Sequence, residues 1–131
     1  MSVSGVPLYM ESVTAGFPSP AQDYVEQSLD LNALCVKRPA ATFFVRVSGE
    51  SMTGAGIRPG DVLVVDRSLQ AAHGDIVIAA LHGEFTVKEL SLRPPRLLAH
   101  HPDFPAIELD ALESLEVFGV VTGVVRTLAR R

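Results

Sequence analysis

The stretch TFFVRVSGESMTGAGIRPGDVLVVD, residues 42–66, places two apolar runs on either side of a glycine-rich segment. Both runs are rich in β-branched and aromatic residues, which are typical of strands. The glycines and the Arg58-Pro59-Gly60 tripeptide between them favour tight turns. The stretch therefore predicts a strand over 42–47, a turn-rich connection and a second strand over 61–66.

The same alternation of apolar runs and turn residues continues toward the C-terminus. His82-Gly83 joins two runs as the turn of a predicted β-hairpin. The further predicted strands cover residues 75–81, 84–90, 96–100, 106–109 and 115–129. Short strands at regular intervals predict a mainly β fold, a compact antiparallel sheet or partly open barrel carrying one short N-terminal helix.

The N-terminal part shows weaker periodicity. Residues 1–18 contain Gly5, Pro7, Gly16 and Pro18, and we expect a mobile arm there, followed by one domain over 19–131. A helix is predicted over 20–29, because Ser19, Pro20 and Gln22 form a capping box with proline at the first helical position. Asp30 is a candidate cap for a further turn through Cys35.

Composition narrows the classes of function. Hydrophobic residues make up 47% and charged residues 20% of the 131, which is ordinary for one globular domain. A net charge of -4 disfavours direct nucleic-acid binding. The lone Cys35 excludes an internal disulfide, and no zinc-site spacing occurs, so we expect neither metal nor cofactor. Without a signal-like or membrane-spanning segment, a soluble cytoplasmic protein is expected.

Two residues are candidates for nucleophilic chemistry. Ser51 lies among glycines directly after a predicted strand, where a hydroxyl can be presented outward, although an ordinary solvated turn has the same composition. A serine needs a base, and none of the four histidines is obviously placed beside it. Lys88 lies inside the predicted strand 84–90, where lysine is depleted, although it also suits the outer face of a hairpin.

A lysine acts as a base near neutral pH only when it is largely uncharged. Lowering its pKa from about 10.4 to near 7 costs roughly 4.6 kcal/mol. Burial produces shifts of this size. A base role for Lys88 therefore predicts that its amine is nearly dry.

Taken together, two motifs resemble those of the LexA/UmuD family of self-cleaving Ser-Lys peptidases (peptidase S24). The nucleophile motif is matched by Gly49-Glu50-Ser51-Met52 and by Gly56-Ile57-Arg58-Pro59-Gly60-Asp61. The lysine motif is matched by Gly74-Asp75-Ile76-Val77 and by the run from Glu84 to Lys88. The resemblance covers nearly the whole chain from Ala15 and is strongest to the UmuD branch, the accessory subunits of SOS-induced translesion DNA polymerases.

The resemblance implies a set of roles and partners. Ser51 would be the nucleophile, Lys88 the general base, and the backbone N–H groups of Glu50 and Ser51 the oxyanion donors. The matching scissile bond is Ala15-Gly16, with alanine where UmuD itself has cysteine. The family further implies a homodimer, stimulation by the RecA-ssDNA filament, and a UmuC-like Y-family DNA polymerase as partner.

Other interpretations remain at this point. One is a non-enzymatic module that regulates a polymerase by binding alone, with a vestigial dyad. A LexA-type repressor is disfavoured because only fifteen residues precede Gly16, and a signal peptidase is disfavoured because no membrane anchor is present.

Overall fold

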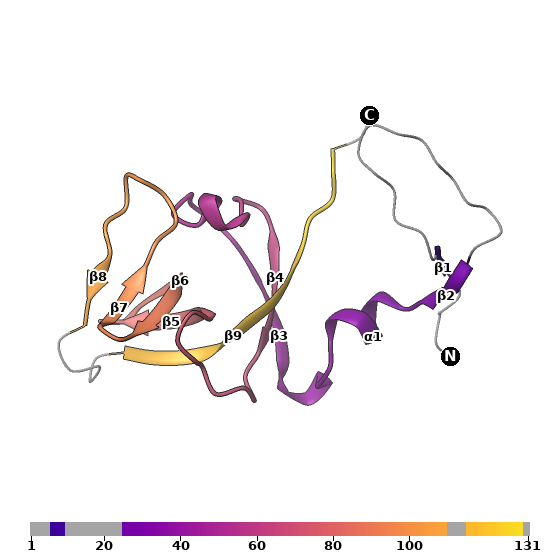
Figure 1. Cartoon of the computed structure of the whole chain (residues 1–131), viewed down its shortest axis with the longest axis horizontal. Helices are drawn as coiled ribbons and strands as arrows, with labels where there is room; N and C mark the ends of the chain where they lie inside the picture. Colours follow the sequence, from indigo (N-terminus) through magenta and orange to yellow (C-terminus); the bar gives the residue numbers. More distant parts are fainter. Residues whose placement is uncertain (1–5, 10–24, 110–114, 130–131) are drawn as a thin grey trace. The chain divides into compact units, whose positions relative to one another are not determined.

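The computed structural model describes residues 6–9, 25–109 and 115–129. They belong to two compact units, one ending at Lys37 and one beginning at Arg38. Figure 1 shows the elements of each unit. Within the described ranges, no helix is long and apolar enough to cross a membrane.

The N-terminal unit contains two strands and a short helix. Strand β1 (Val6–Tyr9) pairs antiparallel with β2 (Val25–Leu29), and helix α1 (Leu31–Cys35) follows. The Asp30 carboxylate accepts a 3.0 Å hydrogen bond from the Asn32 N–H, so the predicted cap and the turn through Cys35 are confirmed.

The helix predicted over 20–29 is wrong at its C-terminal half, where β2 stands instead. Residues Val25–Leu29 satisfy their backbone groups by pairing with β1, a strand that the sequence pattern does not predict. This pairing overrides the local capping signal. Ser19, Pro20 and Gln22 lie outside the described residues.

The larger unit is one antiparallel sheet, which confirms the predicted mainly β class. Its strand order is β3-β4-β9-β5-β6-β7-β8. In Figure 1 the long yellow strand β9 passes between the β3–β4 pair and the β5–β6 pair. The strands are β3 (Thr42–Arg46), β4 (Val62–Asp66), β5 (Ile76–Leu81), β6 (Glu84–Leu92), β7 (Pro95–Leu98), β8 (Ile107–Glu108) and β9 (Leu115–Val125).

The turn between β5 and β6 is the predicted hairpin. His82 and Gly83 have φ angles of 54° and 84°, the left-handed conformation that two-residue hairpin turns require at both central positions. The turn sets the register in which Val77 faces Lys88 across the two strands. It therefore determines where along β6 the lysine lies.

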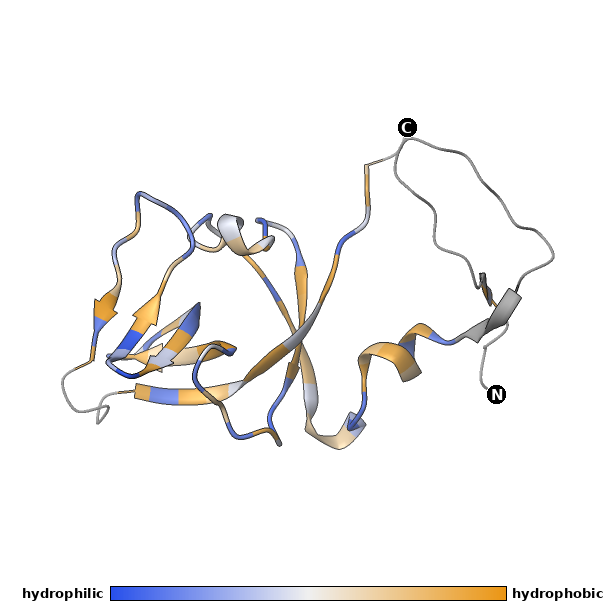
Figure 2. Ribbon diagram, in the orientation of Figure 1, coloured by the Kyte–Doolittle hydropathy of each residue, from blue (hydrophilic) through white to orange (hydrophobic). Residues whose placement is uncertain are grey.

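Two groups of buried apolar side chains stabilise the sheet. The first contains Val47, Met52, Ile57, Leu63, Val65 and Ile78, and the second contains Val77, Ala79, Leu90, Leu97, Leu109 and Val120. Figure 2 shows hydrophobic colour concentrated along the strands and hydrophilic colour in the connections of this unit. Met52, in the first group, belongs to the glycine-rich connection between β3 and β4, so this connection is packed against the core.

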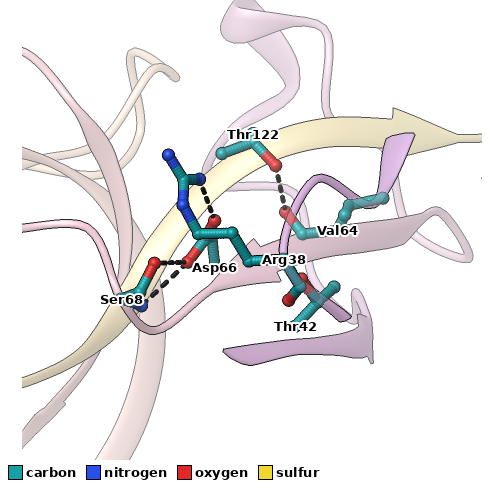
Figure 3. Close-up of polar contacts among 6 residues, drawn as sticks. All are labelled: Arg38, Thr42, Val64, Asp66, Ser68 and Thr122. Carbon is teal, nitrogen blue, oxygen red and sulfur yellow. Dashed lines mark hydrogen bonds and ion pairs between the residues drawn. The ribbon is translucent and has the colours of Figure 1, made fainter. Parts of the chain in front are cut away.

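A polar contact fixes the beginning of the larger unit to its sheet. Asp66 lies at the end of β4 and is 3% exposed. Its carboxylate forms an ion pair with Arg38, which donates a 2.7 Å hydrogen bond to it. Ser68 donates to the same carboxylate through its hydroxyl and its backbone N–H. Figure 3 shows Arg38 and Ser68 converging on Asp66, with Thr122 of β9 donating to the Val64 carbonyl nearby.

Candidate active site

Ser51 lies on the turn that connects β3 with β4. Its neighbour Met52 is only 2% exposed and packs in the core, so its side chain anchors the turn to the core. Inside the turn, Thr53 N–H donates to the Glu50 carbonyl and Ala55 N–H donates to the Met52 carbonyl. The serine is thus held on an anchored turn and not on a loose loop.

Lys88 reaches this serine from β6. Its Nζ lies 3.1 Å from Ser51 Oγ, although the two residues are 37 positions apart in the sequence. The same nitrogen lies 2.6 Å from Thr86 Oγ1 and 3.3 Å from the Val87 carbonyl. The structure therefore brings together the serine and the lysine that the sequence singled out.

The surroundings of Lys88 disfavour its charged form. The residue is 9% exposed, and burial lowers the pKa of its amine below the ordinary value. Its neighbours Ser51, Thr86 and Val87 offer dipoles but no negative charge, and no ion pair involves Lys88 among the described residues. A neutral amine beside a hydroxyl is the arrangement that activates a serine.

A cleft opens beside the serine. Its volume is about 260 Å³. Its wall is formed by residues of β3, the Ser51 turn and β6, together with two core side chains: Val45, Arg46, Val47, Ser48, Ser51, Leu63, Ile78, Phe85, Thr86 and Val87. Largely apolar walls next to a serine hydroxyl suit an extended peptide with small or apolar side chains.

Potential oxyanion donors lie at the same turn. Within the described part of the chain, the backbone N–H groups of Glu50 and Ser51 donate no hydrogen bond to protein acceptors. Such free N–H groups next to a nucleophile can stabilise a developing oxyanion. Their assignment to that role stays a prediction.

Three of the four histidine side chains hydrogen-bond to partners other than Ser51. His73 accepts from the Leu92 N–H, His100 pairs with Glu89, and His101 accepts from the Asp103 N–H. His82 lies in the hairpin turn. Lys88 is therefore the titratable side chain that contacts the Ser51 hydroxyl within the described ranges.

The sequence did not single out Thr86, although it carries the shortest of the three contacts to the Lys88 amine. A signal was present, because residues two apart on a strand point to the same side. Ala15 and Gly16, the predicted scissile pair, lie outside the described residues. The described ranges contain no group of three or more His, Cys, Asp or Glu residues arranged to hold a metal ion.

Comparisons with known proteins show the family of the chain. The model of the Peptidase S24-like family matches residues 7–122. Protein MucA of Salmonella typhimurium is 55% identical over 122 residues, 92% of this chain and 84% of that protein. Protein ImpA of Shigella flexneri is 56% identical over 119 residues, 91% of this chain and 82% of that protein. The LexA repressor of Shewanella piezotolerans is 38% identical over 125 residues, 93% of this chain and 60% of the repressor. The chain therefore belongs to the Peptidase S24-like family.

Proposed function

We propose that the chain is a UmuD-like peptidase that cuts its own Ala15-Gly16 bond with Ser51 as nucleophile and Lys88 as general base. The observation that carries the proposal is the 3.1 Å contact between Lys88 Nζ and Ser51 Oγ. Burial of the amine supports it, because a base must be uncharged before it can accept a proton.

The reaction is an acyl transfer in two halves. Neutral Lys88 takes the hydroxyl proton of Ser51, and the serine oxygen attacks the carbonyl carbon of Ala15. The protonated lysine then donates to the Gly16 nitrogen as the C–N bond breaks, which leaves residues 1–15 as an ester on Ser51. Water, deprotonated by the regenerated neutral lysine, hydrolyses this ester and releases the peptide.

Thr86 has a defined part in this scheme. A neutral amine has one lone pair, which must point at the Ser51 hydroxyl to accept its proton. The Thr86 oxygen, 2.6 Å from Nζ, accepts one N–H of the amine and so limits its rotation. The threonine thus helps to direct the lone pair toward the serine.

The scissile bond suits the cleft by size. Alanine and glycine are the smallest flanking residues available, so an extended chain can approach Ser51 closely. Within the proposal, residues 1–18 form the arm that supplies this bond, and residues 19–131 form the peptidase and dimerisation domain.

The proposal extends to a cellular role. We propose a cytoplasmic homodimer of the SOS response, whose cleavage is stimulated by the RecA-ssDNA filament. The trimmed form would act as accessory subunit of a UmuC-like, error-prone translesion polymerase. Similarity to proteins MucA and ImpA over most of the chain supports this placement.

The test is incubation of the purified chain at mildly alkaline pH, with and without a RecA-ssDNA filament, followed by N-terminal sequencing. A new terminus at Gly16 is expected, and Ser51→Ala and Lys88→Ala should each abolish it. Absence of any cut under both conditions would favour the second candidate, a polymerase-binding module with a vestigial dyad.

The same assay distinguishes cleavage within one chain from cleavage between chains. A Ser51→Ala chain supplies the bond without a nucleophile, and a Gly16→Val chain supplies the nucleophile without a cleavable bond. If the mixture yields the trimmed Ser51→Ala chain, one subunit cuts another. If it stays intact while the unmodified chain is cut, the reaction is intramolecular.

A further inference from the structure

The segment that follows β7 is joined to the Ser51 turn by two backbone hydrogen bonds. The His100 N–H donates to the Ser51 carbonyl at 2.7 Å, and the Gly54 N–H donates to the His100 carbonyl at 2.7 Å. Both bonds involve one residue, so the backbone of His100 pairs with the turn on both sides of Met52. The carbonyl of the proposed nucleophile is therefore held by His100.

Gly54 makes this approach possible. A Cβ at position 54 would lie 2.6 Å from the His100 carbonyl oxygen and 3.2 Å from its carbonyl carbon. Any larger residue would push the turn away from His100, because the contact is with backbone and not with a flexible side chain. The turn is thus built to lie directly against this residue.

The side chain of His100 points to a second anchor. Its Nε2 lies 2.6 Å from Glu89 Oε1, with side-chain exposures of 33% and 26%. Glu89 directly follows Lys88 on β6. An ionised carboxylate only accepts hydrogen bonds, so the imidazole donates from Nε2.

We propose that His100, through its hydrogen bond with Glu89, is a positioning residue that ties the Ser51 turn to the strand carrying Lys88. The backbone of His100 holds the nucleophile turn, and its ring holds β6 one residue from the base. This inference rests on the proposed Ser51–Lys88 chemistry and adds a contact that holds the two residues in position.

The His100–Glu89 pair acts on the reaction indirectly, through the positions of Ser51 and Lys88. Successive side chains of a strand point to opposite sides, so Glu89 and Lys88 leave β6 in opposite directions. The Nζ contacts are to Ser51, Thr86 and Val87, not to the pair. The pair therefore sets the distance between nucleophile and base without entering the proton transfer.

The competing view is an ordinary, partly exposed polar contact between the two side chains, which contributes little to stability and nothing to geometry. The two views predict different kinetics. A positioning pair acts as a unit, so removing either partner should cost as much as removing both. An incidental pair should leave the cleavage rate unchanged.

The experiment measures self-cleavage of the full chain against pH for His100→Ala, Glu89→Ala and the double variant. We expect each to lower the maximal rate by about tenfold, since small misplacements of reacting groups are costly. The double variant should be no slower than the single ones, and the midpoint of the pH profile, which reports Lys88, should not move. The exchanged pair His100→Glu with Glu89→His should recover part of the rate.

The matched control is His101→Ala, the adjacent histidine, whose ring hydrogen-bonds within its own loop through the Asp103 N–H. It should cleave at the unmodified rate. Unchanged rates in the His100 and Glu89 variants, or losses that add in the double variant, would overturn the inference while leaving Ser51 and Lys88 in place.

Backbone amide exchange of residues 48–57 gives a readout that does not depend on cleavage. Faster exchange in His100→Ala and Glu89→Ala, but not in His101→Ala, is expected from a loosened turn. Identical exchange in all variants would overturn the inference even if the unmodified chain proved uncleavable.

Discussion

The Lys88 amine combines three features at the scale of one residue: it is buried, it contacts the Ser51 hydroxyl, and it donates to the Thr86 oxygen. Burial lowers its pKa because a low-dielectric environment disfavours the ammonium form. A neutral amine in contact with a hydroxyl can accept its proton. Each feature leads to a separate measurement.

The first prediction concerns pH. Because the pKa of Lys88 is lowered, the neutral fraction grows at a lower pH than for an ordinary lysine. The self-cleavage rate should rise with pH along a single ionisation and reach half its maximum below about pH 10.4, the ordinary lysine value. A rate that is flat with pH, or that falls as pH rises, would argue against lysine as the base.

The second prediction concerns Thr86. Thr86→Val keeps the shape but removes the oxygen that accepts from Nζ, so the cleavage rate should fall by about tenfold, equivalent to one hydrogen bond. Thr86→Ser restores the oxygen and should recover most of the rate. Equal rates for the valine and serine variants would show that the hydroxyl has no part in orienting the amine.

At the scale of elements, the position of Ser51 depends on how its turn is seated. Met52 projects into the core beside Val47 and Ile57, while the backbone of the turn is held by His100. Lys88 depends on the β5–β6 hairpin, whose two-residue turn sets the register of β6. The contact between Ser51 and Lys88 therefore depends on how both of these elements are seated.

Met52→Ala tests this anchoring. Removing a side chain that is 2% exposed should lower the free energy of unfolding by about 2–5 kcal/mol, as measured by urea denaturation. Leu97→Ala, from the other core group, is the matched control and should cost a similar amount. Well below both melting temperatures, only Met52→Ala should slow cleavage; equal slowing by both would assign the effect to general stability.

Most elements of the larger unit were predictable because their signals are local. The β-branched runs and the His82-Gly83 turn identify strands and a hairpin without knowledge of the rest of the chain. The paired serine and lysine motifs were likewise visible in the sequence. Their 3.1 Å contact was not, because it depends on sheet order.

The features that the sequence analysis missed also depend on contacts between distant parts of the chain. Val25–Leu29 was predicted as helix because its partner, β1, lies sixteen or more residues earlier, beyond the reach of a local pattern. The contacts of Thr86 with Lys88 and of His100 with the Ser51 turn likewise join residues from different elements or depend on the folded strand. Long-range pairing was therefore the part that the sequence could not supply.

At the scale of the larger unit as a whole, Asp61 and Arg126 join the segment after β9 to the Ser51 turn. Asp61 is 1% exposed and accepts two 2.7 Å bonds from Arg126, which follows β9. Arg126 also donates to the carbonyl of Gly56 in the turn. The hydrogen bonds from Arg126 lower the pKa of Asp61 from 3.8 to about 2, helped by the N–H of Arg58.

A second stability test follows from this shift in the pKa of Asp61. A carboxyl whose pKa is lower in the folded state stabilises the fold above its unfolded pKa and loses that contribution as pH falls through its folded pKa. The free energy of unfolding should therefore fall between about pH 4 and pH 2, and Asp61→Asn should show a smaller fall in that window. Glu116→Gln, an exposed carboxyl change on β9, should retain the fall; an unaltered curve for Asp61→Asn would contradict the assignment.

The most direct test of the central claim is the intact mass of the full chain followed over time at mildly alkaline pH. The account predicts conversion of the unmodified chain to one species that begins at Gly16, and no conversion of Ser51→Ala or Lys88→Met. A first cut at another bond, or a cut at Gly16 that persists in Ser51→Ala, would contradict it.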